Sequence, residues 1–542
     1  MTKIISMKNL KLTLSGFCLV LIYACNETPK TAFNNNVISA AHPLASLAGK
    51  AMYAQGGNAF DAAVSAAFSL SVVESSMSGI GGRLQAIYRT SDGSIAGVDA
   101  STEVPIKYTP LEQKYSYGYE TIGIPGVVAG LIKLQEDHGV LELNAVLAPA
   151  INYAENGYVM LPGEALRQQI AAEKIAEFEG SSHHFLKGNG TANSAGDLII
   201  QKDLAEVLKA IAAKGRKGFY EGEVARKIVE DIQANGGIIT LEDLKNYKAL
   251  SSKIVDGVFK DHKVHSLYLP SFGAITVQIL QILDHLPSFN SEEDWAFSNG
   301  KATEIAYEFR KKQENLDSLN LILSYEKAGE LANKIDSSFS NIQTNIESDN
   351  PVSFGSIDGH TTHLTAVDHF GNAVSLTQTI GPNMGSKVAT KGLGFLYAVT
   401  LGGYLGDYKP GDRANSHISP TIITKDGELI LAIGAAGGSR IVPAITQVVS
   451  RHIDQKNTLE RSLMLPRVYP FEDTLWIEDH DSVKEMNAVL NATIFRTKMI
   501  NSIARFGRVH AVSFDSLSNS WKGAADPDWE GTTEYYIDDE KN

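Results

Sequence analysis

The run Gly359-His360-Thr361-Thr362-His363 contains the residue types best suited to covalent chemistry. A hydroxyl is a weak nucleophile unless a base lies beside it. A threonine at a chain N-terminus carries such a base in its own α-amine, whose ordinary pKa of about 7.7–8.0 leaves a useful neutral fraction near pH 7. One hypothesis is therefore that Thr361 cuts the His360–Thr361 bond and then serves as nucleophile and base together. The alternative is that Thr361 and Thr362 are β-branched residues that open a strand, and spacing alone favours this alternative.

Other motifs for metal or cofactor chemistry carry little weight. The sequence has no Walker phosphate loop, no His-Glu-x-x-His motif and no cysteine pair spaced for zinc. His183-His184 stands in a Ser- and Gly-rich stretch, which predicts a surface loop in preference to a metal site. We therefore predict that the chain requires neither a metal nor a cofactor.

Composition and charge indicate an acidic chain that can fold. Its 542 residues carry 48 Lys and Arg against 62 Asp and Glu, for a formal net charge of −14. A nucleic-acid binder needs a basic face to neutralise phosphates, so this class is disfavoured. With 43% hydrophobic and 20% charged residues, the chain has enough apolar surface to bury a core.

The N-terminus predicts export. Three lysines precede the apolar stretch 12–24, which is shorter than the roughly 20 residues of a membrane span but suits a secretory signal. Leu21-Ile22-Tyr23-Ala24-Cys25 is similar to a bacterial lipobox. We predict a lipoprotein signal peptide over 1–24, lipidation of Cys25, a tether over 25–37 and a location facing the periplasm or cell surface. An ordinary signal peptide with an incidental cysteine is the alternative.

The first part of the body is rich in helix patterns. Residues 40–76 are apolar nearly all round any helix, which predicts buried helices. The glycine cluster Gly79-Ile80-Gly81-Gly82 precedes a predicted strand over 84–88. Residues 130–250 have the pattern of amphipathic helices, and 292–350 predict solvated helices that lead into a loose loop.

From Gly359 the pattern changes to strands. Residues 363–368 and 373–377 predict a hairpin around a glycine-containing turn. A second strand pair is predicted over 421–424 and 429–432, followed by the glycine-rich run 434–440 and an apolar helix. Helix-rich sequence followed by strand-rich sequence favours an α/β body that contains antiparallel sheet.

Residues 361–375 resemble the nucleophile motif of the gamma-glutamyltranspeptidase family, which belongs to the N-terminal-nucleophile (Ntn) hydrolases. The resemblance runs from about residue 38 to the C-terminus. It includes, in family order, Gly57-Asn58-Ala59-Phe60-Asp61-Ala62-Ala63, Ser78-Gly79-Ile80-Gly81-Gly82, Gly123-Ile124-Pro125-Gly126, Gly237-Ile238-Ile239-Thr240-Leu241-Glu242-Asp243-Leu244, Ser419-Pro420-Thr421, Gly437-Gly438-Ser439-Arg440 and Gly523-Ala524-Ala525-Asp526-Pro527.

This resemblance implies a fold and a set of catalytic residues. The fold is the four-layer αββα sandwich of the superfamily, built from two fragments, 38–360 and 361–542, that separate at the self-cleaved His360–Thr361 bond and stay associated. Thr361 is implied as nucleophile and Thr379 as its supporting hydroxyl. Gly437 and Gly438 are implied as the backbone donors of an oxyanion hole, where such donors often contribute the largest catalytic effect.

Several positions that bind the glutamyl group in the family differ here. The family arginine aligns with Ser101, which lacks the bidentate fork that grips a carboxylate. A family asparagine aligns with Gly381, and the stretch that holds the amine aligns with 398–403. Ser416 of a family serine pair is kept, and its partner is His417.

Two further departures concern the shape of the site. Arg83 follows the glycine cluster where the family has small residues, and it either supplies a replacement cation or forms a salt bridge elsewhere. Residues 404–413 are too few for the flap that covers the site in many members, which predicts an open cleft.

We therefore predict an exported, self-cleaving hydrolase that cuts an amide through a Thr361 acyl-enzyme with water as acceptor. Glutathione and other γ-glutamyl peptides are the substrates that the family resemblance implies. The alternatives are an amidase or acylase with a different acyl specificity, and a processed but inactive binding protein.

Overall fold

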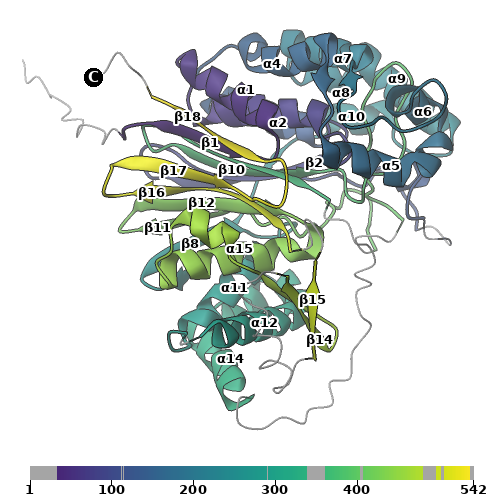
Figure 1. Cartoon of the computed structure of the whole chain (residues 1–542). Helices are drawn as coiled ribbons and strands as arrows, with labels where there is room; N and C mark the ends of the chain where they lie inside the picture. Colours follow the sequence, from purple (N-terminus) through teal and green to yellow (C-terminus); the bar gives the residue numbers. More distant parts are fainter. Residues whose placement is uncertain are drawn as a thin grey trace, which may run out of the picture. The chain divides into compact units, whose positions relative to one another are not determined.

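Two antiparallel sheets form the centre of the fold in the computed structural model (Figure 1). The structure describes residues 33–110, 113, 115–289, 291–338, 360–402, 407–479, 496–501 and 506–537, all within one unit, Ala32–Asn542. The predicted signal peptide, Cys25 and Gly403 lie outside the described residues. Residues 33–37, the end of the predicted tether, belong to the folded body, since Phe33 packs on Trp521 and a strand begins at Asn36.

The first sheet contains the predicted hairpin. Its order is β18-β1-β9-β10-β2-β3-β6. The strands are β1 (Asn36–Ala40), β2 (Arg83–Arg89), β3 (Ile95–Ala100), β6 (Leu250–Ser251), β9 (Thr362–Val367), β10 (Ala373–Thr379) and β18 (Thr532–Tyr536). The hairpin is β9 and β10, and the predicted 84–88 strand is β2, so both predictions are confirmed.

The second sheet packs face to face on the first. Its order is β17-β16-β12-β11-β8-β7, with β7 (Ile254–Phe259), β8 (His262–Leu267), β11 (Thr421–Lys425), β12 (Glu428–Ala436), β16 (Arg508–Asp515) and β17 (Ser520–Ala525). Hydroxyls join the two faces: Thr365 donates to the His510 carbonyl at 3.0 Å and Ser375 to the Ile433 carbonyl at 2.9 Å. Because side chains alternate along a strand, the neighbouring residues of β9 and β10 face the opposite way, toward helices.

Helices cover the other face of the first sheet, where Leu364 and Leu376 join one apolar cluster with α1 and α2. These helices are α1 (Pro43–Ala54), α2 (Ala59–Val73), α3 (Val127–His138), α4 (Leu143–Asn156), α5 (Pro162–Ala176), α6 (Glu179–Phe185), α7 (Lys202–Lys214), α8 (Lys217–Tyr220), α9 (Gly222–Ala234) and α10 (Leu241–Asn246). Every residue of α2 is buried, and Asn58 and Asp61 form a capping box at its start. The prediction of buried helices over 40–76 is confirmed.

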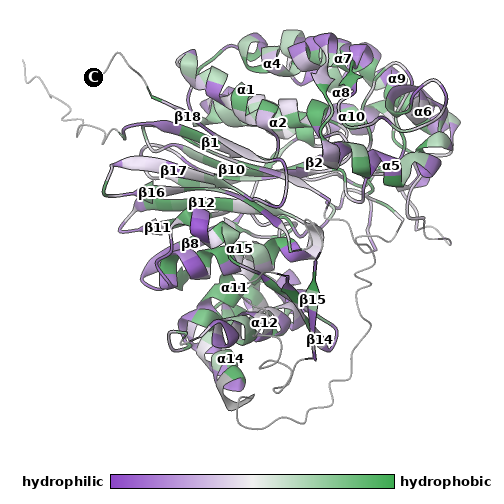
Figure 2. Cartoon of the chain, in the orientation of Figure 1, coloured by the Kyte–Doolittle hydropathy of each residue, from purple (hydrophilic) through white to green (hydrophobic). Residues whose placement is uncertain are grey.

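A second helical layer covers the outer face of the second sheet. It contains α11 (Gly273–Asp284), α12 (Glu292–Glu308), α13 (Leu316–Ile322), α14 (Tyr325–Ser338), α15 (Ile441–Val449) and α16 (Leu459–Met464). In Figure 2, α11 and the central strands β10 and β12 are largely hydrophobic. The predicted four-layer αββα arrangement is therefore confirmed.

One expectation for this layer is wrong. Residues 292–350 were expected to form solvated helices, yet Trp295 and Phe297 of α12 are buried in the core, and α14 buries Leu331. Residues 295–300 of α12 are all buried although charged residues stand before and after them in the sequence, and a count of charges does not reveal this burial.

Small additional strands complete the fold. A three-stranded sheet contains β13 (Val468–Phe471), β14 (Thr474–Glu478) and β15 (Arg496–Ile500), and a short pair contains β4 (Tyr158–Val159) and β5 (Leu198–Ile199). Across the described ranges, no helix combines the length and the hydropathy needed to cross a lipid bilayer.

Candidate active site

The ends of three adjacent strands bring Thr361, Thr379 and Arg83 into a row. β10 lies between β9 and β2, with Gln378 paired with Thr362 and Thr379 paired with Arg83. Thr361 directly precedes β9, so the same register carries it opposite Thr379. Neighbouring strands lie about 4.8 Å apart, so the two threonines are neighbours in space. Thr361 is 3% exposed and is therefore shielded from bulk water.

The backbone of Thr361 is in an unfavourable conformation. Its φ is 151°, in the positive region that L-residues with a branched Cβ avoid. Such a conformation costs on the order of 1–3 kcal/mol and persists only where the surrounding structure imposes it. The strained residue follows the His360–Thr361 peptide bond that the sequence predicts to be cut.

A glycine turn ends β12 on the facing sheet. Gly437 has φ 141° and Gly438 has φ 61°, and the turn leads through a 3-10 segment into α15. A side chain at Gly437 would place its Cβ 2.8 Å from Gly507 Cα, whereas a Cβ at Gly438 would contact nothing. The turn therefore requires glycine, and it places backbone N–H groups at the start of a helix, where they favour an anion.

Arg508 connects this turn to Thr361. It is the first residue of β16 and pairs with Ala436, the residue before Gly437. Its Nη2 donates to the Thr361 carbonyl oxygen at 3.1 Å. One buried side chain thus contacts the predicted nucleophile while its backbone borders the predicted oxyanion turn.

Thr379 has a defined hydrogen bond. Its Oγ1 accepts from the Gly381 backbone N–H at 2.9 Å. A threonine hydroxyl has one proton to donate, and this contact leaves that proton for another acceptor. Thr361 is the adjacent residue that can receive it.

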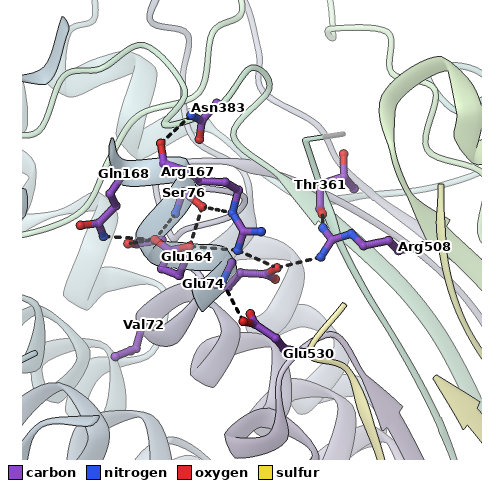
Figure 3. Close-up of polar contacts among 12 residues, drawn as sticks. Val72, Glu74, Ser76, Glu164, Arg167, Gln168, Thr361, Asn383, Arg508 and Glu530 are labelled. Carbon is purple, nitrogen blue, oxygen red and sulfur yellow. Dashed lines mark hydrogen bonds and ion pairs between the residues drawn. The ribbon is translucent and has the colours of Figure 1, made fainter. Parts of the chain in front are cut away.

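A buried network of ion pairs holds the Arg508 side chain (Figure 3). Arg508 Nη1 lies 3.3 Å from Glu74 Oε1, and the same oxygen lies 3.5 Å from Arg167 Nη2. Arg167 in turn lies 3.1 Å from Glu164, which also accepts from the hydroxyl and the backbone N–H of Ser76. The chain of charges ties α5 and the end of α2 to the carbonyl of Thr361.

Cations surround His360 as well. The pKa of the His360 imidazole is lowered to about 3. Burial is the largest cause, followed by the charges of Lys387, Arg440, Arg167 and Arg508. The ring is therefore neutral near pH 7. The same cations lie close enough to favour any negative charge that develops beside Thr361.

Ser416 and His417 lie beside Pro270 and Phe272, in the segment that precedes α11. The Ser416 N–H donates to the Pro270 carbonyl at 2.8 Å. The His417 ring packs edge-on against Phe272 at 4.5 Å, and burial together with Arg310 and Arg440 lowers its pKa to about 3. The charge of Arg440 contributes to the lowered pKa of both His360 and His417.

Arg83 occupies the space beside Gly381. The side chain is 1% exposed, and its Nη2 donates to the Val399 carbonyl at 2.7 Å. A Cβ at Gly381 would lie 3.0 Å from the same Nη2. The larger side chain that the family resemblance expects at this position would therefore contact the guanidinium directly.

Ser101 is turned into the protein interior. It is fully buried, its Oγ accepts from Gln85 Nε2 at 2.9 Å, and its carbonyl accepts from Tyr247 at 2.6 Å. The Ser101 hydroxyl is thus already hydrogen-bonded to a protein group. It also carries no charge with which to bind a carboxylate.

Sequence reasoning missed the network of Glu74, Glu164, Arg167 and Arg508. No short motif joins these residues, since they come from three separate segments: Glu74 follows α2, Glu164 and Arg167 lie in α5, and Arg508 begins β16. The one signal in the sequence was the presence of charged residues within otherwise apolar or glycine-rich stretches, such as Glu74 after an apolar helix.

Buried neutral histidines predict a pH-dependent stability. The pKa values of His42, His360, His417 and His510 are each lowered to about 3, chiefly by burial. Their unfolded pKa is about 6.5, so between pH 6.5 and 3 the unfolded state binds more protons and the stability they contribute is lost as pH falls. His510→Gln should reduce the slope of unfolding free energy against pH by about 1.4 kcal/mol per pH unit, measured by urea unfolding at pH 4 to 6. The exposed His285→Gln is the control, and an unchanged slope in His510→Gln contradicts the prediction.

Comparison with known proteins identifies the family. The family model described as gamma-glutamyltranspeptidase matches residues 45–536. The chain belongs to the gamma-glutamyltranspeptidase family. A "Glutathione hydrolase proenzyme" from Pseudomonas sp. (strain A14) is 30% identical over 498 residues, covering 85% of this chain and 86% of the relative. An "Acylase ACY 1 proenzyme" from Pseudomonas sp. (strain V22) is 29% identical over 526 residues and covers 91% and 92%.

Solved structures agree on the fold of this gamma-glutamyltranspeptidase-family enzyme. The cephalosporin acylase from Bacillus halodurans superposes with a TM-score of 0.83 at 24% identity, covering 93% of this chain and 96% of that one. The predicted Ntn-hydrolase fold and the prediction that the chain is an enzyme are both confirmed.

Proposed function

We propose that this gamma-glutamyltranspeptidase-family enzyme activates itself by cutting the His360–Thr361 bond and then hydrolyses an amide through Thr361. The observation that carries the proposal is the position of Thr361: buried, strained, beside Thr379 and linked by Arg508 to the Gly437–Gly438 turn. The names of relatives as proenzymes support a processing step.

The first reaction rearranges the chain. Thr361 Oγ1 attacks the His360 carbonyl carbon, its proton passes to the Thr361 nitrogen, the C–N bond breaks, and the His360 acyl group moves from nitrogen to oxygen as an ester. Water then hydrolyses that ester, which leaves a carboxylate on His360 and a free α-amine on Thr361. Release of the strained φ favours the forward direction.

The second reaction uses the new N-terminus. The α-amine takes the Oγ1 proton as Thr361 attacks the substrate carbonyl, and the N–H groups of Gly437 and Gly438 stabilise the oxyanion. The leaving amine receives the proton and departs. Water then cleaves the acyl-enzyme by the same route. We propose that hydrolysis is favoured over transfer, a preference that rests on the small number of residues over 404–413 in the sequence.

Intact-mass analysis and N-terminal sequencing of the purified protein test this proposal. Two fragments, one of which begins at Thr361, are expected, together with turnover of a chromogenic γ-glutamyl anilide. A chain that stays uncut over days overturns the mechanism. Cleavage without anilide turnover keeps the self-processing step and favours the acylase alternative, which the buried Ser101 and the absence of a side chain at Gly381 support.

Arg83 is proposed to bind the carboxylate of the acyl group. Its guanidinium lies beside Gly381, and its strand pairs with that of Thr379, so it brings a positive charge to the row that holds the threonines. Ser416 and His417 would line the opposite wall. A charge-assisted hydrogen bond contributes about 1.5–3 kcal/mol, which corresponds to roughly 10- to 100-fold in binding.

Arg83→Met is therefore expected to raise KM for a γ-glutamyl anilide by about 10-fold or more, with little change for an uncharged butanoyl anilide. Steady-state kinetics on both substrates measure this difference. Arg89→Met, at the far end of the same strand, is the matched control, since Arg89 is also buried and donates to the Gly371 carbonyl. An equal loss on both anilides shows that Arg83 does not recognise the carboxylate.

We also propose that the enzyme is exported and anchored through a lipid on Cys25, as the lipobox-like run supports. Cys25→Ser should move the protein from the membrane fraction to the soluble exported fraction. Equal fractionation of the two proteins contradicts the anchor.

A further inference from the structure

A cluster of two histidines and a carboxylate lies outside the candidate active site. Among the residues that the structure describes, His183, His184 and Asp203 place one ligand atom each within 4.8 Å of one another. His183 and His184 belong to α6, and Asp203 lies in the first turn of α7. The sequence analysis expected a surface loop at His183-His184, and the structure corrects this, because the segment is helical.

The His184 ring is largely enclosed by the surrounding protein, since 10% of its side chain is exposed. Nε2 has no hydrogen-bond partner and lies 3.9 Å from Asp203 Oδ2. A buried ring nitrogen beside a carboxylate, with no hydrogen bond of its own, is available to a ligand.

Packing also fixes the helix that carries both histidines. The Ser181 hydroxyl accepts from the Ala389 N–H at 2.7 Å. A Cβ at Gly180 would lie 2.0 Å from the Ala389 carbonyl, so α6 approaches the 389–390 segment as closely as backbone allows. The position of His184 is thus set before any ligand arrives.

We propose that His183, His184 and Asp203 bind a divalent transition-metal ion, with zinc as the best-matched case. Two imidazole nitrogens and one carboxylate oxygen form a ligand set that zinc accepts at about 2.0–2.2 Å, with water in the fourth position. Small rotations of the exposed His183 and Asp203 side chains close the 4.8 Å spacing to that range. A cavity of ≈ 560 Å³, lined in part by Asp203, Glu206 and Lys217, adjoins the Asp203 side of the cluster.

The expected consequence is a clamp between α6 and α7. The ion would bind the folded protein and not the unfolded chain, so it raises stability as its concentration rises. The site shares no residue with the network around Thr361, and its loss is expected to leave self-cleavage intact.

Zinc titration of tag-free, chelator-treated protein tests the proposal. Isothermal titration calorimetry with ZnCl₂ should give one equivalent bound to the wild type, and His184→Ala and Asp203→Asn should each weaken binding about 10-fold or more. Zinc at about 100 times the wild-type Kd should raise the Tm of the wild type by about 2 °C or more and that of each variant by about half as much or less.

His265→Ala is the matched control, because His265 also contacts a carboxylate, Asp256, at 2.6 Å but has no second histidine beside it. It should bind zinc as the wild type does. The metal-free Tm of each variant confirms that it is folded. Equal zinc binding by the wild type, His184→Ala and Asp203→Asn, or no saturable binding by the wild type, overturns the proposal.

Discussion

Thr361→Ala is expected to remain a single uncut chain and to lose amide hydrolysis by at least about 10³-fold. Alanine removes the only atom that can attack the His360 carbonyl, so neither the new N-terminus nor the acyl-enzyme can form. Gel electrophoresis and intact mass measure the first effect. Hydrolysis of a γ-glutamyl anilide over hours measures the second.

Two neighbouring substitutions make this test specific. Thr361→Ser keeps a hydroxyl and should keep cleavage at a reduced rate. Thr362→Ala removes a buried hydroxyl that has no hydrogen-bond partner, so both cleavage and turnover should survive. Normal fragments from Thr361→Ala, or an uncut Thr362→Ala, would place the nucleophile elsewhere.

Glu74→Gln is expected to destabilise the protein by about 3–5 kcal/mol and to slow self-cleavage. Glu74 is the carboxylate between Arg508 and Arg167, and its side chain is 2% exposed. Loss of its charge leaves Arg508 buried with less compensation, and Arg508 then holds the Thr361 carbonyl less firmly. Urea unfolding and the time course of fragment formation measure the two effects.

A role in positioning requires more than lost stability. In cleaved Glu74→Gln protein, kcat should fall while KM changes little, because Glu74 acts through Arg508 and not on the substrate. Glu330→Gln is the control: Glu330 forms an exposed pair with Lys327 at 2.6 Å, and its loss should change stability by no more than about 1 kcal/mol. A Glu74→Gln protein with the stability and kcat of the control would contradict this role.

The fold was predictable wherever local pattern and burial agree. The 363–377 hairpin carries β-prone residues around a turn, and α2 is apolar on all sides, so each has one favourable structure. Within the 292–350 segment, the described part 292–338 was misjudged because a count of charges does not reveal that residues 295–300 enter the core. His183-His184 was misjudged because serine and glycine suggest a loop, while contacts with the 389–390 segment stabilise a helix.

The candidate site was predictable only in part. Thr361 and the Gly437–Gly438 turn stand in short motifs, so sequence alone singled them out. Arg83 was noticed as a departure, but its place beside Gly381 follows from the pairing of β2 with β10. The ionic network depends on three distant segments meeting in space, and no local pattern encodes such a meeting.

The strand order determines how the enzyme can unfold and refold after the proposed cut. In the first sheet, β1 from the larger fragment lies between β18 and β9 of the smaller one, and β10 is followed by β2 of the larger. The second sheet likewise joins β11 of the smaller fragment to β8 of the larger.

Neither fragment keeps a complete sheet alone, so dissociation requires unfolding of both. Folding is first order for the intact chain but becomes second order once the bond is cut. Enzyme that is denatured at high dilution is therefore expected not to refold to the native state. The proposed self-cleavage would thus make unfolding of the enzyme effectively irreversible.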